Sequence, residues 1–174
     1  ASTYRGEGSS YVSYNCARYI STLVNRKVAW IDCDFQNPNK KLQNNTLTIK
    51  GMLLDPQSVP DLDKDPELVV VGNGPQSIKV MDLLKGPNLR AVLDRLQRNC
   101  YFVILDAGPI MDSVEVAHLA QDTLGLILVI QSNRLKHEVV QHGLDRLRDH
   151  NVDILGTVLN KRTFHIPEFI YKRL

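Results

Sequence analysis

The chain has 174 residues, an apolar content of 43%, and charges of both signs that leave a formal net charge of +2. This length fits one domain with a single core, and the composition excludes disordered and collagen-like chains. No apolar run approaches the roughly 20 residues that a membrane-spanning helix needs, and so small a net charge gives no argument for binding nucleic acid or an anionic membrane surface.

Predicted helices and strands alternate along the chain. A first helix begins at Ser9 or Ser10 and runs to about Asn25, and the spacing of apolar residues predicts further helices over 88–99 and 135–151. Continuous apolar runs indicate strands that are covered on both faces. The alternation predicts a three-layer α/β fold with a mostly parallel sheet flanked by helices. The five predicted strands are 28–32, 67–72, 101–106, 123–131 and 152–160.

Two regions depart from this alternation. Residues 36–66 are rich in Asn, Pro, Asp and Lys, which predicts a surface loop with one or two helical turns. At the start, only ASTYR precedes a glycine-rich stretch of the kind that normally follows a strand. We therefore expect residues 1–174 to form a single domain from a longer protein in which a strand precedes Ala1. The C-terminal residues are expected to form a helix packed by Phe164, Phe169 and Ile170.

The three cysteines, Cys16, Cys33 and Cys100, are widely spaced and form no CxxC pair. A disulfide framework or a zinc site is therefore not expected, and a reducing cytoplasm is the predicted compartment.

The stretch RGEGSSY has the glycines and hydroxyls of a loop that binds phosphate through backbone N–H groups at a helix start. In the pattern GxxxxGK[ST], the lysine adds a positive charge and the hydroxyl holds Mg²⁺. If Gly8 is the second glycine, Ser9 takes the place of the lysine and Ser10 that of the magnesium hydroxyl. Taken alone, the match to this pattern is weak, and a Gly/Ser turn that caps a helix is the favoured interpretation.

Acidic residues end two of the predicted strands. VAWIDCDFQNP ends in Asp32 and Asp34, and YFVILDAGP ends in Asp106. Residues two apart on a strand face the same way, and open α/β folds bind ligands at the carboxyl ends of their strands. A glycine loop and three strand-end acids together predict a site for a phosphate chain with Mg²⁺.

The order of these motifs resembles the cytoplasmic domains of bacterial tyrosine kinases. GEG-SS is followed by VAWIDCDFQNP, FVILDAGP, GLILVIQSN and ILGTVLN, and the likeness extends from Ser2 to about Lys161. These kinases form the capsular and exopolysaccharide family within the Min/Par-type deviant P-loop ATPases. Its members typically read PGEGKST, IDADLRRP and IIDTPP at the first three motifs. The resemblance implies a P-loop NTPase-like domain that binds ATP or ADP with Mg²⁺.

The resemblance also implies roles for individual residues. Catalytic roles fall to Asp32, Asp34 and Asp106, and metal binding falls to Ser10, Asp32 and Asp106. The implied nucleotide-binding residues are Gly6, Glu7, Gly8, Ser9, Ser10, Tyr11 and, near the adenine ring, Asn160.

The departures from the family pattern are as informative as the matches. Ser9 replaces the loop lysine, Arg5 replaces the loop proline, and Gln36 and Asn37 replace a pair of arginines. A serine hydrogen bond is worth about 1 kcal/mol net, whereas a lost charge pair near a protein surface is worth about 4 kcal/mol before desolvation. Nucleotide binding is therefore doubtful and little or no catalysis is predicted. Arg5 is interpreted as a solvated residue rather than as a replacement for the lysine.

The predicted function is that of a degenerate, pseudokinase-type module that regulates assembly or chain length in exopolysaccharide or capsule biosynthesis. The resemblance implies a location at the inner face of the bacterial inner membrane, a membrane-spanning chain-length regulator as partner on the same or a separate chain, and self-association. No specific nucleic acid is expected. Two alternatives stay open: an active Mg-ATP-dependent tyrosine kinase or ATPase, and a Par/Min-type positioning ATPase.

Overall fold

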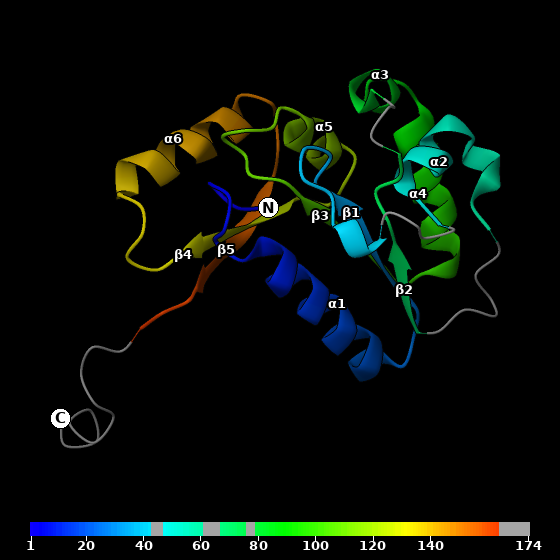
Figure 1. The fold of residues 1–174 in the computed structure, drawn as a ribbon, viewed down its shortest axis with the longest axis horizontal. Helices are drawn as coiled ribbons and strands as arrows, with labels where there is room; N and C mark the ends of the chain where they lie inside the picture. The colour runs from blue at the N-terminus through cyan, green and yellow to red at the C-terminus, as the bar shows by residue number, and fades with distance from the viewer. Residues whose placement is uncertain (43–46, 61–66, 76–78, 164–174) are drawn as a thin grey trace.

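The computed structural model describes residues 1–42, 47–60, 67–75 and 79–163, and these form parallel strands flanked by helices (Figure 1). The predicted α/β class is confirmed, and each predicted strand and helix that falls within the described residues lies within a few residues of its expected position. The helices are α1 (Ser9–Val24), α2 (Ile49–Leu54), α3 (Val80–Leu84), α4 (Asn88–Asn99), α5 (Glu115–Gln121) and α6 (His137–Arg148), and 3₁₀ turns occupy Lys40–Leu42 and Pro56–Ser58. The strands are β1 (Val28–Cys33), β2 (Leu68–Val71), β3 (Phe102–Ala107), β4 (Leu126–Gln131) and β5 (Ile154–Asn160).

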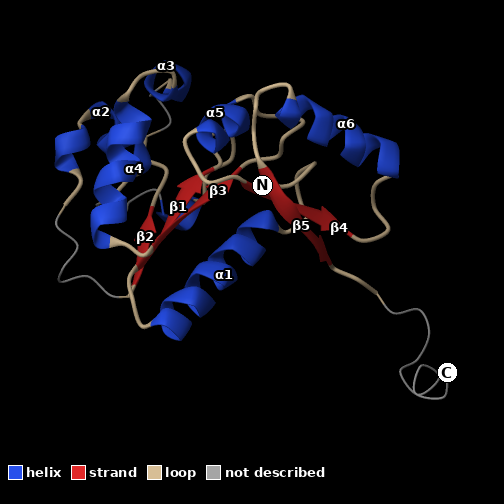
Figure 2. Cartoon of the chain, turned by 180° about the vertical axis from the view of Figure 1, so that it is seen from behind, coloured by secondary structure: helices blue, strands red, loops and turns tan. Residues whose placement is uncertain are grey.

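The strands pair in parallel as two groups. One group has the order β2-β1-β3 and the other is the pair β4-β5. The start of the chain lies between them, because Ser2 forms single parallel bridges with both Pro109 and Val129 (Figure 2). This arrangement brings the glycine stretch that follows Ser2 to the same edge as the carboxyl ends of β1 and β3.

Strand β1 is buried along its whole length, as its continuous apolar sequence predicts. Val28 and Trp30 pack toward Ala17 of α1, whereas Ala29 and Ile31 belong to the larger core on the opposite side. In the ribbon view α1 covers one face, while the other helices lie across the opposite face (Figure 1). The domain therefore has three layers.

Helix α4 follows the predicted amphipathic pattern. Its buried residues are Leu89, Val92, Leu93 and Leu96, which form one stripe along the helix. Full burial of such side chains contributes about 1.5–3 kcal/mol each. This packing anchors the helix that leads into β3, and the parallel register of β3 with β1 then places Asp106 opposite Asp32.

Two expectations need correction or restriction. Strand β5 is not covered on both faces: Leu155 and Leu159 are about 60% exposed, because no described helix packs closely over the face of β5 that carries them. The predicted helix with Phe164, Phe169 and Ile170 lies outside the described residues. Residues 36–66 contain the expected short helical turns, of which α2 is the longest. Within the described ranges, no helix has the length and apolar content needed to cross a membrane.

Candidate functional site

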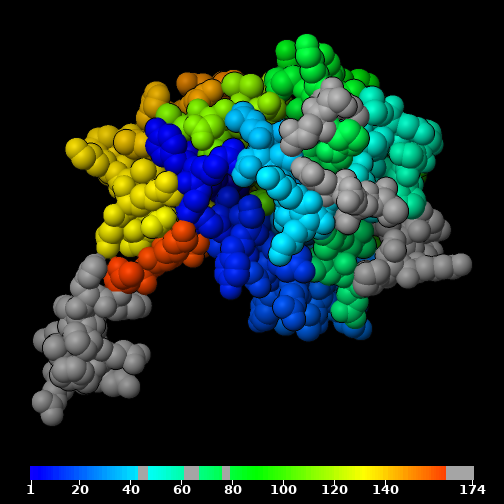
Figure 3. All heavy atoms as spheres, viewed as in Figure 1, coloured from blue at the N-terminus to red at the C-terminus, as the bar shows by residue number. Residues whose placement is uncertain are grey.

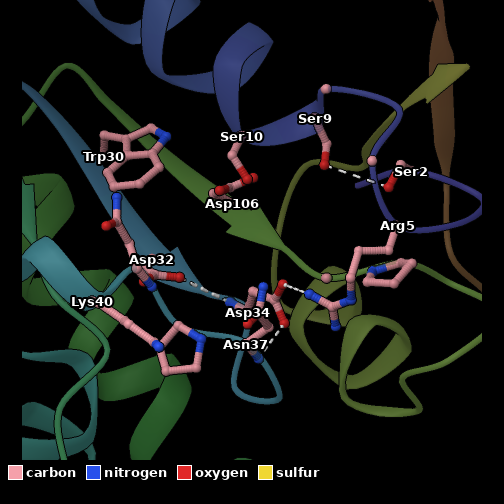
Figure 4. A pocket seen from close by; sticks show the side chains of 16 residues that line it. Ser2, Arg5, Ser9, Ser10, Trp30, Asp32, Asp34, Asn37, Lys40 and Asp106 are labelled. Atoms are coloured by element: carbon pink, nitrogen blue, oxygen red, sulfur yellow. Dashed lines mark hydrogen bonds and ion pairs between the residues drawn. The ribbon is translucent and has the colours of Figure 1, made fainter. Parts of the chain in front are cut away.

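Three segments meet at the carboxyl edge of β1 and β3. They are the glycine loop before α1, the segment that follows β1, and the end of β3 with the residues after it. On the surface of the molecule the start of the chain lies against the segment that follows β1 (Figure 3). Together they enclose a cavity of about 500 Å³, a volume typical of small-molecule sites. It is lined by Ser2, Arg5, Gly6, Gly8, Ser9, Ser10, Trp30, Asp32, Asp34, Asn37, Pro38, Asn39, Lys40, Asp106, Gly108 and Pro109 (Figure 4).

The glycine loop has the backbone conformation that a phosphate-binding loop requires. Gly6 and Gly8 have φ values of 90° and 95°, which side chains other than glycine rarely adopt. No side chain caps the start of α1 at Gly8. The first N–H groups of a helix have no acceptor within the helix and attract anions. The loop therefore presents backbone donors to the cavity.

The loop is held in place from outside the cavity by a buried carboxylate. Glu7 is completely buried, and it accepts hydrogen bonds from the backbone N–H groups of Tyr4 at 2.9 Å and Gln131 at 3.1 Å. The side-chain amide of Asn160 donates to the backbone carbonyl of Glu7 at 2.9 Å. Glu7 and Asn160 thus connect the loop to the ends of β4 and β5.

The predicted nucleotide-binding residues therefore divide into three groups. Gly6, Gly8, Ser9 and Ser10 line the cavity, whereas Glu7 and Asn160 support the loop from behind. Tyr11 is 73% exposed on α1 and does not line the cavity.

The two strand-end acids Asp32 and Asp106 lie side by side, because they are directly paired in the parallel register of β1 and β3. Asp32 is buried, and both of its carboxylate oxygens accept backbone N–H groups, from Asp34 at 3.1 Å and from Asn39 at 2.8 Å. Burial raises the pKa of Asp32, although these two donors oppose the rise. Asp32 thereby fixes the segment that carries Asp34 and Lys40.

Asp106 is the acid that remains available to a ligand. It is 2% exposed, and its Oδ1 accepts no hydrogen bond from any residue the structure describes. Burial raises the pKa of Asp106 from 3.8 to about 6, although the hydroxyls of Ser10 and Ser13 oppose the rise. A buried acceptor without a partner, beside the hydroxyl of Ser10, fits a cation or a cation-bound water (Figure 4).

Asp34 is engaged by a cation that the motifs did not predict. Its Oδ2 lies 2.8 Å from Nη1 of Arg5, and its Oδ1 accepts the backbone N–H of Asn37 at 3.0 Å. Lys40 also lines the cavity, so two cationic side chains face three aspartates. The lining therefore has a formal charge of about −1 with all five groups ionised.

Ser9 occupies the position of the loop lysine. Its hydroxyl lies 3.4 Å from the hydroxyl of Ser2, and both line the cavity. The indole of Trp30 forms another part of the lining and donates to Ser13 at 3.0 Å. Sequence reasoning did not identify Arg5, Lys40 or Trp30 as site residues. The one sequence signal for Lys40 was its position only a few residues after the second motif. Trp30 gave no such signal, because in the sequence it looks like any other apolar strand residue.

The residues present fit Mg²⁺ bound together with a phosphate chain. Among the described residues, no three His, Cys, Asp or Glu side chains are grouped closely enough to hold a metal by themselves. Mg²⁺ usually takes only one or two carboxylates and completes its coordination with water and substrate phosphates. Asp106 and Ser10 supply such a partial set, and the glycine loop supplies donors for the phosphates.

Sequence comparison agrees with this geometry. No protein-family model matches the chain. Over 170 residues it is 27% identical to tyrosine-protein kinase CpsD of Streptococcus agalactiae serotype III (strain NEM316), a match that covers 92% of this chain and 72% of that kinase. The chain is homologous to the CpsD tyrosine kinases. The resemblance inferred from the motifs is thus confirmed.

Solved structures support the fold of this CpsD homologue. The VpsO kinase domain superposes with a TM-score of 0.80 at 24% identity, covering 94% of this chain and 83% of that domain. A plasmid partition protein from Borrelia burgdorferi superposes with a TM-score of 0.67 at 20% identity, covering 100% and 84% of the two chains. At these identities the superpositions establish the P-loop NTPase-like fold.

Proposed function

We propose that this CpsD homologue is a module that binds a Mg²⁺-nucleotide, transfers phosphate poorly or not at all, and serves capsule or exopolysaccharide assembly. The observation that carries the proposal is Ser9 at the lysine position of an otherwise well-formed loop. The cavity keeps its backbone donors and its acids, and it lacks the cation at the loop position that stabilises the transferring phosphate.

Binding is supported by the parts of the site that do not depend on the lysine. Gly6 and Gly8 keep the loop open to the cavity, and Glu7 holds it rigidly from behind. When bound, Mg²⁺ would neutralise phosphate charge, and Asp106 with Ser10 would hold it. The glycine loop, Asp106 and Ser10 therefore favour a site that still binds a phosphate chain together with Mg²⁺.

Catalysis is expected to suffer more than binding. Phosphoryl transfer depends on stabilising charge as it develops, and a fixed cation near a protein surface is worth about 4 kcal/mol per contact before desolvation. The Ser9 hydroxyl supplies no charge and lies beside Ser2. A loss of even 3 kcal/mol in the transition state lowers the rate by about two orders of magnitude.

The relatives support a proposed setting for the module. CpsD is named as a tyrosine-protein kinase, and the resemblance implies capsule or exopolysaccharide assembly. We propose a membrane-spanning chain-length regulator as partner, self-association of the module, and a position at the cytoplasmic face of the membrane.

An active kinase is the second candidate function. The observation in its favour is that Arg5 and Lys40 place two positive charges in the cavity. An active enzyme would phosphorylate its own tyrosines or release phosphate from MgATP. Replacing Arg5 and Lys40 by neutral residues would then abolish this activity.

Restoring the lysine tests the proposal. Ser9→Lys should raise the turnover of MgATP at least tenfold over a wild-type rate near the uncatalysed background, because it returns the missing charge to the loop. Ser58→Lys adds the same charge at an exposed serine away from the cavity and should change nothing. A wild-type rate well above the background and equal to that of Ser9→Lys would refute the proposed loss of catalysis.

A further inference from the structure

We propose that Arg5 is the phosphate-binding cation of this cavity. Without a ligand Arg5 is paired with Asp34, and when a triphosphate chain binds, the guanidinium leaves Asp34 and contacts the phosphates. The inference rests on the proposed function, because it concerns the same cavity. It adds the identity of the positive group and the ligand class, namely a linear chain of three phosphates, in a nucleotide or free.

The position of Arg5 supports this role. It directly precedes Gly6, whose φ of 90° turns the chain at the rim of the cavity. The close-up view shows the guanidinium reaching from the loop toward Asp34, apart from the pair Ser10 and Asp106 (Figure 4). A chain held by Mg²⁺ at Asp106 would therefore have its other end near Arg5.

The ion pair is open to solvent on the side of its cation. The Arg5 side chain is 42% exposed and that of Asp34 is 16% exposed, and pairs that solvent screens contribute on the order of 1 kcal/mol. Only Nη1 contacts Asp34, so the guanidinium has further N–H donors for phosphate oxygens. Arginine binds phosphate through paired hydrogen bonds that are stronger than neutral ones.

Asp34 does not lose all its partners when Arg5 moves. Its Oδ1 keeps the backbone N–H of Asn37 at 3.0 Å, and its carboxylate is partly exposed to solvent. The exchange therefore leaves no buried charge without a hydrogen bond, and a phosphate that carries more negative charge than one carboxylate competes well for the guanidinium.

We expect Lys40, on the wall of the cavity opposite Arg5, to assist Arg5 in binding phosphate. It begins the 3₁₀ turn Lys40–Leu42 and lines the cavity, and the preceding residue, Asn39, is fixed to Asp32 at 2.8 Å. In contrast, Lys161 donates to the carbonyl of Gly6 at 2.7 Å and does not line the cavity. Among the described residues, Arg5 and Lys40 are the cationic side chains that line the cavity.

The test uses the single tryptophan of the chain as its reporter, because Trp30 lines the cavity. Titrations of MgATP, magnesium tripolyphosphate and MgAMP into the whole protein measure affinity. Arg5→Gln should weaken triphosphate binding at least tenfold, Arg5→Lys should weaken it less, and Lys40→Gln should weaken it about threefold. AMP, which has one phosphate, should bind poorly and show little dependence on Arg5.

Matched controls separate local from general charge effects. Lys41→Gln removes the neighbouring exposed lysine, which does not line the cavity, and Arg90→Gln removes an exposed arginine that is also paired with an aspartate. Both should bind triphosphate within twofold of the wild type, and circular dichroism checks that each variant is folded.

The outcomes distinguish the two proposals. Similar affinities for ATP and tripolyphosphate would support recognition of the phosphate chain alone, and a clear preference for ATP would support a nucleotide held by the same cation. Wild-type binding that Arg5→Gln leaves unchanged would overturn the role of Arg5 and leave the proposed function standing. Failure of the wild type to bind any of the three ligands would overturn both.

Discussion

Replacing Glu7 should destabilise the whole domain, although the residue touches no ligand. Glu7→Ala leaves the backbone N–H groups of Tyr4 and Gln131 without their acceptor in a completely buried place. Each unsatisfied buried donor costs about 1–3 kcal/mol, so the free energy of unfolding should fall by about 2–6 kcal/mol. Glu7→Gln keeps one acceptor oxygen and turns an NH₂ group toward the other donor, which should cost about 1–3 kcal/mol.

Urea unfolding monitored by Trp30 fluorescence measures this effect, because Trp30 is buried in the fold and is the single tryptophan of the chain. Glu67→Ala, just before β2, is the matched control, since its exposed side chain lies outside every helix and should change stability by less than about 0.5 kcal/mol. If Glu7→Ala unfolds at the same urea concentration as the control, Glu7 does not hold the loop and our description of the loop as rigid is incorrect.

Other residues of the site give three further predictions. The pKa of Asp106 is raised from 3.8 to about 6 in the folded state, so the folded protein binds more protons there than the unfolded chain. Protonation therefore contributes stability that is fully present below pH 3.8 and lost as the pH rises through about 6, an effect of about 3 kcal/mol. Asp106→Asn should accordingly raise the melting temperature at pH 7.5 and flatten the pH dependence between 4 and 6; equal melting curves at pH 7.5 would contradict this. In the wild type, the affinity for Mg²⁺-triphosphate should fall as the pH drops below 6, because Asp106 must be ionised to hold the metal; a titration series that is flat from pH 7.5 to 5 would speak against the assignment. Gly8→Ala should cost about 1–2 kcal/mol from its φ of 95° alone, and a new Cβ would clash with Nδ2 of Asn160. Gly156→Ala, where a Cβ meets nothing within 4 Å, is its thermal-melting control, and equal losses in the two variants would refute the close approach of Asn160.

Much of the fold is predictable from the sequence, because buried strands and amphipathic helices leave strong periodic signals. The runs that became β1 and β3 end in acids, and parallel register alone was enough to bring Asp32 and Asp106 together. The partial exposure of β5 was not predictable, because a continuous apolar run does not reveal whether a helix covers both faces of the strand. Helix α5, a seven-residue element, is too short for its periodicity to be recognised.

The site was predictable as a set of motifs and less so as a set of contacts. The glycine loop and Asp106 follow from local chemistry and strand-end position. The support of Glu7 by Gln131, across 124 residues of sequence, depends on tertiary packing that no local pattern encodes. The same holds for Arg5, whose pairing with Asp34 became visible only when the loop and the end of β1 were placed side by side. Asp32 and Asp34 look equivalent in the sequence IDCD. In the structure, however, the Asp32 carboxylate accepts backbone N–H groups, whereas the Asp34 carboxylate pairs with the guanidinium of Arg5.

The central claim is that the cavity binds a Mg²⁺-nucleotide without turning it over. Calorimetric titration of MgATP into the wild-type protein, followed by measurement of phosphate release and phosphotyrosine on the same sample, tests it most directly. We predict saturable binding that requires Mg²⁺, with phosphate release at the background rate and no phosphotyrosine. Turnover that follows the binding curve, or an absence of binding at millimolar MgATP, would contradict the claim.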